Sequence, residues 1–152
     1  MNNPFKITIL TLYPEYFNVL QLGVIGRALS KSLWSLEIIN IRDFAFDKYK
    51  KVDDKVFGGG RGLLLKPDVL GEAIEFAFSQ GASKNLIYPS PRGAVFNQDI
   101  AGSLSVSESQ GLTFLCGHFE GIDERIIEKY QPLEISIGDY ILSGGELATC
   151  VI

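Results

Sequence analysis

Short runs of apolar and β-branched residues recur along the chain with helix-forming segments between them. This alternation restricts the fold more than any other feature of the sequence. The runs predict strands at residues 5–12, 36–41, 85–88, 112–116 and 133–137. Strands and helices in steady alternation predict an α/β domain with a mainly parallel sheet flanked by helices.

The segments between these strands carry helix signals. Residues 67–80 place apolar side chains at helical spacing, and Gly81 follows as a natural end. Shorter helices are expected after Pro14 and at residues 98–107 and 125–130. We therefore expect one continuous α/β domain without an internal linker.

Three segments depart from the regular pattern. Gly23 and Gly26 are expected to interrupt the helical stretch that precedes the second strand, and residues 42–62 are expected to form a long polar loop that ends in glycines. Residues 146–152 read as a helix that stops in its second turn with apolar side chains left over. We expect from this that the chain is the first part of a longer protein.

The composition is that of a folded globular domain. Of 152 residues, 46% are hydrophobic and 21% charged, which excludes a disordered chain. No apolar run approaches the roughly 20 residues that span a bilayer, and the N-terminus does not resemble a signal peptide, so no membrane partner is expected. With only Cys116 and Cys150 as cysteines and His118 as the single histidine, disulfides and a zinc site are disfavoured and a cytoplasmic location is expected.

The charge of the chain gives an ambiguous indication about nucleic acid. A formal net charge of −4 supplies no general attraction for phosphates. Basic residues do gather locally, at Lys48, Lys50, Lys51, Lys55 and Arg61. Two interpretations stay open at this point: a solvated polar loop, or a local contact surface for nucleic acid.

Glycine-containing segments follow three successive predicted strands, at residues 88–93, 117–121 and 137–146. Ligands of open α/β sheets bind outside the carboxyl ends of the strands, and glycine allows a backbone to approach a ligand closely. One such segment would only turn the chain. Three of them at neighbouring strand ends predict a pocket for a flat purine ligand.

Several common sites are missing or weakly indicated. The chain has no GxGxxG, GxxxxGK[ST] or GxSxG motif, so a dinucleotide fold, a P-loop and a serine hydrolase are not supported. Acidic side chains at Asp53, Asp54, Glu120, Asp123 and Glu124 offer ligands for Mg²⁺, but such carboxylates also occur as solvated groups or helix caps. Mg²⁺ is therefore only a candidate, and no metal-binding residue is assigned.

Longer blocks of the sequence are characteristic of one family. Residues 116–125 (CGHFEGIDER) and 134–147 (EISIGDYILSGGEL) resemble the signature of the tRNA (guanine-N1)-methyltransferase (TrmD) family. Residues 10–15, 26–28, 40–44, 52–54 and 57–62 are similar to that family in order and spacing. The resemblance covers essentially the whole chain.

The resemblance implies a SPOUT-type fold with a C-terminal trefoil knot, a homodimer, and S-adenosyl-L-methionine held by the knot loops. Residues 1–152 would form this cofactor-binding domain, and a C-terminal tRNA-binding domain would lie outside the chain. The implied cofactor contacts are Tyr88, Pro89, Ser90, Pro91, Gly93, Gly117, Phe119, Glu120, Gly121, Ile137, Gly138, Tyr140, Leu142, Gly144 and Gly145. The implied tRNA-binding face, with no role for DNA, includes Lys48, Lys50, Lys51, Asp53, Asp54 and Arg61.

The implied reaction moves a methyl group to N1 of the guanine that is 3′-adjacent to the anticodon. A base must remove the N1 proton, and similar enzymes place an aspartate base and an arginine beyond the point where this chain ends. We therefore expect this chain to bind the cofactor without methylating tRNA. Glu120 is the candidate catalytic residue within the chain, the alternative being a carboxylate that favours the N-terminus of the following helix.

Other functions remain to be weighed. One is a knotted module that binds RNA or dimerises without catalysis, although intact glycines in all three segments argue against a degenerate cofactor site. Another is a SPOUT methyltransferase of a different RNA. A nucleotide-binding oxidoreductase is the most distant of the alternatives, because its glycine fingerprint is absent.

Overall fold

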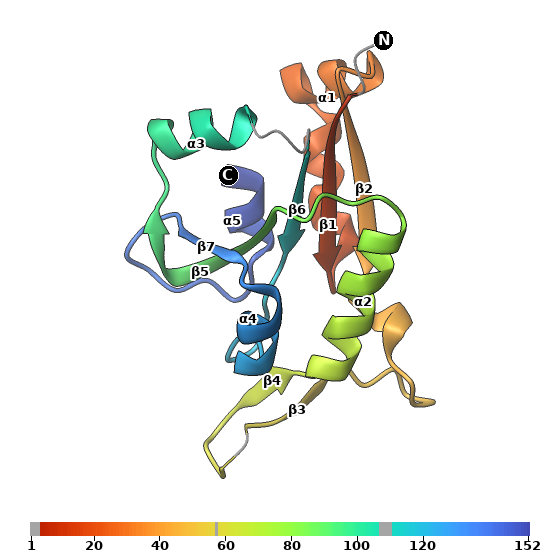
Figure 1. Cartoon of the computed structure of the whole chain (residues 1–152), viewed down its shortest axis with the longest axis vertical. Coiled ribbons are helices and arrows are strands. Elements are labelled where there is room, and N and C mark those ends of the chain that lie inside the picture. Colours follow the sequence, from red (N-terminus) through yellow and green to blue (C-terminus); the bar gives the residue numbers. More distant parts are fainter. Residues whose placement is uncertain (1–3, 57, 107–110) are drawn as a thin grey trace.

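A five-stranded parallel sheet organises the chain, as the computed structural model in Figure 1 shows. The structure describes residues 4–56, 58–106 and 111–152. Phe57 of the glycine-rich block and Ser107, the expected last residue of a helix, lie outside the described residues. The sheet order is β2-β1-β6-β5-β7, formed by strands β1 (Phe5–Thr11), β2 (Trp34–Asn40), β5 (Leu86–Val95), β6 (Gly111–Leu115) and β7 (Leu133–Ser136).

All neighbouring strands of this sheet run parallel, which confirms the expected fold class. Because the strands are parallel, their carboxyl ends meet at one edge of the sheet, so the segments that follow them lie close together. The central strands are buried on both faces, with Ile9 on one side and Leu10 on the other.

Helices cover both faces of the sheet. The long helix α2 (Pro67–Ser79) buries Val69, Leu70, Ala73, Ile74 and Ala77, and α4 (Glu124–Tyr130) packs on the same side. The opposite face is covered by α3 (Gln98–Ser105), α5 (Glu146–Val151) and the 3₁₀ helix η1 (Pro14–Gln21). Over the described residues, no helix is long and apolar enough to cross a membrane.

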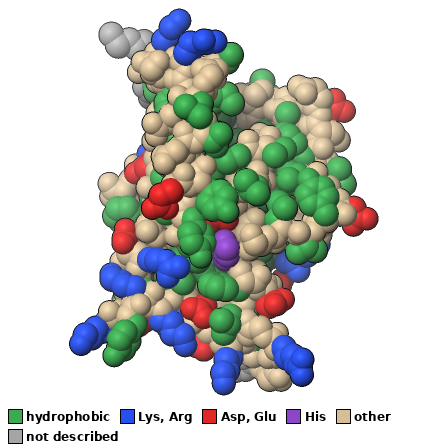
Figure 2. All heavy atoms as spheres, turned by 180° about the vertical axis from the view of Figure 1, so that it is seen from behind, with side chains coloured by type: hydrophobic (Ala, Val, Ile, Leu, Met, Phe, Trp, Pro, Cys, Tyr) green, Lys and Arg blue, Asp and Glu red, His purple; other side chains and the backbone are tan. Residues whose placement is uncertain are grey.

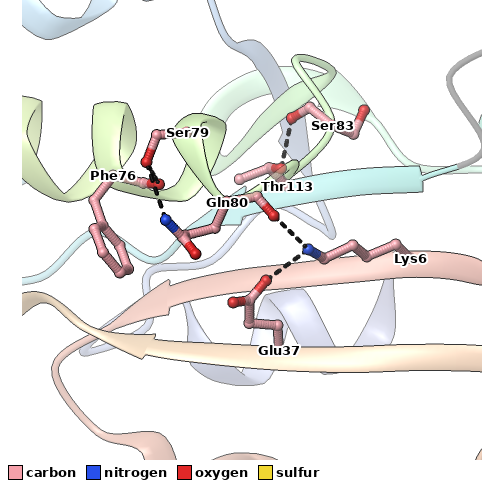
Figure 3. Close-up of polar contacts among 7 residues, drawn as sticks. All are labelled: Lys6, Glu37, Phe76, Ser79, Gln80, Ser83 and Thr113. Carbon is pink, nitrogen blue, oxygen red and sulfur yellow. Dashed lines mark hydrogen bonds and ion pairs between the residues drawn. The ribbon is translucent and has the colours of Figure 1, made fainter.

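Polar contacts attach the C-terminal end of α2 to the sheet, at the edge away from the strand carboxyl ends (Figure 3). The Lys6 ammonium pairs with Glu37 on β2 at 2.8 Å and donates to the backbone carbonyl of Gln80 at 3.3 Å. The buried Thr113 hydroxyl donates to the carbonyl of Ser83 at 2.6 Å. A cation at a helix C-terminus is favourable, so Lys6 stabilises both the strand pair and the helix end.

Gly23 interrupts the helical stretch as expected, because η1 ends at Gln21 and α1 (Gly23–Ser30) begins at Gly23, whose φ is 61°. The expectation for Gly26 was wrong, because this glycine lies inside α1 and serves packing: a Cβ at this position would overlap the backbone of Gln21. The lack of a side chain lets the helix lie directly against the end of η1.

The segment expected to be one polar loop, residues 42–62, is also partly ordered. It begins with the 3₁₀ helix η2 (Ile41–Phe44) and contains β3 (Asp53–Lys55), which pairs antiparallel with β4 (Leu63–Leu65). The buried side chains of Val52 and Leu65 anchor this hairpin to the body of the domain. Three-residue strands are too short to show alternation, so the sequence pattern missed them.

Strand β5 extends much further than expected. Residues 85–88 were predicted as strand and the following prolines and glycine as loop, but β5 continues to Val95. Its pairing with β7 shifts between Pro89 and Ala94, so the intervening residues form a bulge. Proline has no N–H to donate to a neighbouring strand. It is tolerated at such a bulge because the regular pairing is interrupted there.

Candidate functional site: a pocket at the carboxyl edge of the sheet

The three glycine-containing segments meet around one cavity of about 270 Å³. The first segment is the start of the β5 bulge, the second follows β6, and the third is the long loop between β7 and α5. Their close approach follows from the strand order, since β5 lies between β6 and β7.

Almost all of the predicted cofactor contacts line this cavity. The predicted residues that line it are Tyr88, Pro89, Ser90, Pro91, Gly117, Phe119, Glu120, Gly121, Ile137, Gly138, Tyr140, Leu142, Gly144 and Gly145. Sequence reasoning missed other lining residues, namely His118, Ile135, Ser136, Ile141, Ser143 and Ala148.

Gly93 is the exception among the predicted contacts, because it is absent from the cavity lining. A Cβ on Gly93 would overlap the backbone of Glu134 and Ile135. This glycine therefore allows the bulged part of β5 to lie against β7, and its role is in strand pairing.

A buried polar chain supports one wall of the cavity. Glu146, the first residue of α5, is 2% exposed, and its Oε1 accepts a hydrogen bond from the Thr11 hydroxyl at 2.8 Å. Its Oε2 lies 3.3 Å from Nε2 of His118, which lines the cavity. The Thr11 hydroxyl also accepts from the backbone N–H of Tyr13 at 3.0 Å. This polar chain of side chains joins three parts of the protein that are distant in sequence.

Gly144 lies against this polar chain. It pairs with His118 in an isolated antiparallel bridge, and the neighbouring Gly145 N–H donates to the Gly117 carbonyl at 2.9 Å. A Cβ on Gly144 would overlap both His118 Nε2 and Glu146 Oε2. Glycine at this position therefore lets two walls of the cavity come together.

Glu120 is exposed at the cavity, and its backbone is bound to the β3–β4 hairpin. Its N–H donates to the Leu63 carbonyl at 3.0 Å, and the Leu65 N–H donates to the Gly121 carbonyl at 3.2 Å. Asp123, and not Glu120, caps α4 by accepting from the Arg125 N–H at 3.0 Å. The Glu120 carboxylate is thus not the cap of this helix.

Two of the acidic residues considered for Mg²⁺, Asp123 and Glu124, are paired with arginines. Hydrogen bonds from the Arg125 side chain lower the pKa of Asp123, and Glu124 lies 3.5 Å from Arg92. Within the described ranges, no group of three or more His, Cys, Asp or Glu side chains is arranged to hold a metal ion.

Tyr88, in β5, is an uncharged part of the cavity wall. Burial, together with the nearby charge of Glu134, raises the pKa of Tyr88, so its phenol stays protonated. Burial alone would raise the pKa of Glu134, but hydrogen bonds from Arg92 and Ser90 lower it overall. Arg92 bonds Glu134 at 2.8 Å and so neutralises that carboxylate.

The predicted RNA-binding residues lie on the segment between η2 and β4. The side chains of Lys48, Lys50, Lys51, Asp54 and Arg61 are exposed, and Asp53 is partly buried. Figure 2 shows Lys and Arg side chains gathered at the lower end of the molecule, below an apolar area around the histidine. Because the hairpin is bonded to the loop at Glu120, these charges lie on a segment directly attached to the cavity.

Cys116 does not act as a nucleophile in this site, and thiol labelling can check this. It is fully buried, its Sγ lies 3.3 Å from the Thr149 hydroxyl, and burial strongly raises the pKa of its thiol. We expect the native chain to label with iodoacetamide only at Cys150, which is partly buried, and Cys150→Ser to label about 100-fold more slowly than in urea. Rapid labelling of native Cys150→Ser would contradict this arrangement.

Comparisons with known proteins agree on one family. The family model described as tRNA (Guanine-1)-methyltransferase TrmD matches residues 5–152. Several curated proteins named tRNA (guanine-N(1)-)-methyltransferase are similar to this chain. The one from Rickettsia typhi is 52% identical to it, over 96% of this chain and 62% of the relative. The relative in Rickettsia akari is 53% identical over 95% and 62%, respectively, and that in Ehrlichia ruminantium is 52% identical over 97% and 63%.

The chain thus spans about 62% of the length of the relatives that it matches. The match includes the segments that line the cavity as well as the strands that position them. On this ground, the chain belongs to the tRNA (guanine-1)-methyltransferase TrmD family.

Proposed function

We propose that this chain is the S-adenosyl-L-methionine-binding domain of an enzyme that methylates N1 of the guanine 3′-adjacent to the anticodon of tRNA. The family and the names of the relatives support this activity. The observation that carries the proposal is a cavity built from three glycine-containing segments in which sequence reasoning had placed the cofactor.

The charges around the cavity fit this cofactor better than a nucleotide with phosphates. Of the described residues that line it, none is Lys or Arg, and Glu120 is the one carboxylate. S-adenosyl-L-methionine carries a sulfonium, an ammonium and one carboxylate, whereas a dinucleotide brings a pyrophosphate whose negative charges the Glu120 carboxylate would repel. The cavity therefore supports the methyltransferase over a nucleotide-binding oxidoreductase.

The glycines test the fit more directly. Side chains at Gly144 or Gly117 would fill the space against His118 or the Tyr88 ring, so the walls depend on bare backbone. We propose that these walls hold the adenosine and methionine parts by main-chain hydrogen bonds. When bound, the cofactor supplies the methyl group, while the chain orients it and excludes water.

We propose further that the C-terminal part of the domain forms a trefoil knot. In support, the chain leaves β7 at one edge of the sheet and returns to the end of β6, where Gly145 bonds Gly117. Helix α5 then packs under the sheet beside η1, with Cys150 and Ile152 against the second core cluster (Figure 1). A chain end that passes back across an earlier loop in this way is compatible with a knot, a rare exception to unknotted topology.

The substrate and assembly are proposals of the same kind. The basic residues near the hairpin support contact with tRNA, and a second, tRNA-binding domain would account for the greater length of the relatives. Apolar side chains exposed on α1 and α5, such as Val24 and Val151, support a homodimer. The two free cysteines support a location in the reducing cytoplasm. Glu120 at the cavity mouth is our candidate for contact with the guanine, and we place the proton acceptor outside this chain.

Calorimetric titration tests the proposed cofactor. We expect S-adenosylhomocysteine to bind the chain saturably with one site per chain, and NAD⁺ not to bind, because no Lys or Arg among the described lining residues balances the charge of its pyrophosphate. A folded chain that binds neither compound would favour the non-catalytic RNA-binding or dimerisation module. Methyl transfer to a tRNA transcript by this chain alone would contradict our placement of the proton acceptor.

A further inference from the structure

A row of aromatic rings leads across the surface to the cavity. Ring centroids of Tyr16 and Tyr13 lie 6.4 Å apart, those of Tyr13 and His118 lie 4.9 Å apart, and those of His118 and Phe119 lie 5.7 Å apart. His118 and Phe119 line the cavity, so the row ends at its wall. The residues come from the segments that follow β1 and β6, which are adjacent strands.

These rings are open to solvent. Tyr13 is 37% exposed, Tyr16 45% and Phe119 42%. Figure 2 shows the same region as hydrophobic side chains gathered around the histidine. A partly exposed aromatic patch beside a cavity is typical of a binding surface.

A guanidinium completes the row. The Arg42 Cζ lies 6.0 Å from the centre of the Tyr13 ring, in a cation–π contact. Its backbone N–H is held by the Asn40 side chain at 3.0 Å, at the start of η2. Among the described residues, no carboxylate lies within ion-pair distance of Arg42, so its donors are not committed to a protein anion.

Rings and a guanidinium with uncommitted donors match the chemistry of an unstacked nucleobase and its phosphate. Bases stack on Tyr rings and Arg planes, and this stacking does not depend on a basic protein surface. A site that binds by stacking therefore suits this chain, whose net charge is −4. We propose that Tyr13 and Arg42 form a stacking site for an RNA base that neighbours the guanine at the cavity.

This inference rests on the proposed function, since it takes the ligand to be the RNA substrate. Within that function it assigns a second binding position, outside the cofactor cavity, to residues of the β1 and β2 ends. His118 would couple the two positions, because its ring touches Tyr13 and its Nε2 faces Glu146 behind the cavity wall.

The test uses an anticodon stem-loop RNA with 2-aminopurine next to the guanine, titrated with the full chain at saturating S-adenosylhomocysteine. Stacking quenches 2-aminopurine, so we expect the wild-type chain to quench its fluorescence. Tyr13→Leu, which keeps bulk but removes the ring, is expected to abolish the quench and weaken binding about 5- to 100-fold. Tyr13→Trp is expected to retain both.

Arg42→Ala is compared with Arg27→Ala, which removes the same charge from the exposed face of α1 at the other end of the sheet. We expect only Arg42→Ala to reduce the quench. Equal quench by the wild type and Tyr13→Leu overturns the stacking site. If Tyr13→Leu binds RNA as the wild type does but differs from it in self-association on sedimentation, the stacking site is also overturned. The surface would then be an interface between two copies of the chain. Loss of S-adenosylhomocysteine binding in the wild type would instead be a failure of the proposed function.

Discussion

Gly144→Ala is expected to weaken binding of S-adenosylhomocysteine about 10- to 100-fold, the affinity equivalent of the roughly 1–3 kcal/mol that overpacking a filled site costs. The added methyl group would overlap the His118 ring nitrogen and the Glu146 carboxylate. Glu146 is buried and bonded to Thr11, so the loop that carries Gly144 must move instead. That loop and the segment at Gly117 are two walls of the cavity. Calorimetric titration measures the loss.

The matched control is Gly102→Ala in α3, where a new Cβ would have no atom within 4 Å. This variant is expected to bind as the wild type does and to be about 0.5–1 kcal/mol more stable, because alanine favours a helix. Both variants are compared by circular dichroism before titration. A folded Gly144→Ala chain with wild-type affinity would mean that the cavity does not require the close approach of its two walls.

Glu146→Ala is expected to lower the free energy of unfolding by about 3 kcal/mol, the range found when one partner of a buried polar pair is removed. The carboxylate is 2% exposed, and its loss leaves the Thr11 hydroxyl and His118 without their acceptor. Urea unfolding followed by circular dichroism measures the change. Glu146→Gln keeps an acceptor oxygen and is expected to lose less.

Glu128→Ala serves as the surface control, because Glu128 is exposed on α4. Its effect is expected to stay within about 0.5 kcal/mol. If Glu146→Ala were no more destabilising than Glu128→Ala, water would be replacing the carboxylate, and the polar chain would not be what attaches α5 to the sheet.

The positions of the cavity segments could be predicted because glycine marks them. Each segment follows a strand in sequence, and parallel strands bring their carboxyl ends to one edge whatever their order. The order itself, with β5 between β6 and β7, depends on long-range pairing that no local pattern encodes. Gly93 could not be separated from the other glycines in this way: it lies in a glycine-containing segment like a ligand contact, yet the space beside it is taken by the backbone of β7.

The errors have a common physical cause. The prolines of β5 disfavour a strand locally and Gly26 of α1 disfavours a helix. Tertiary packing overrides both, through the bulge against β7 and the close approach of Gly26 to Gln21. The β3–β4 hairpin has strands too short for any periodicity and is anchored by Leu65 and by its bonds to the loop at Glu120.

The sequence alone determined the fold class, the elements around Pro67 and Asn97, and the glycine-containing segments, because these depend on local conformation and periodicity. Tertiary structure alone decided which side chains meet. Thr11, His118 and Glu146 form one polar chain, and Tyr13 contacts both His118 and Arg42, across separations of up to 135 positions. Such contacts arise only when the sheet brings the ends of separate strands together, so they leave no spacing in the sequence from which they could be predicted.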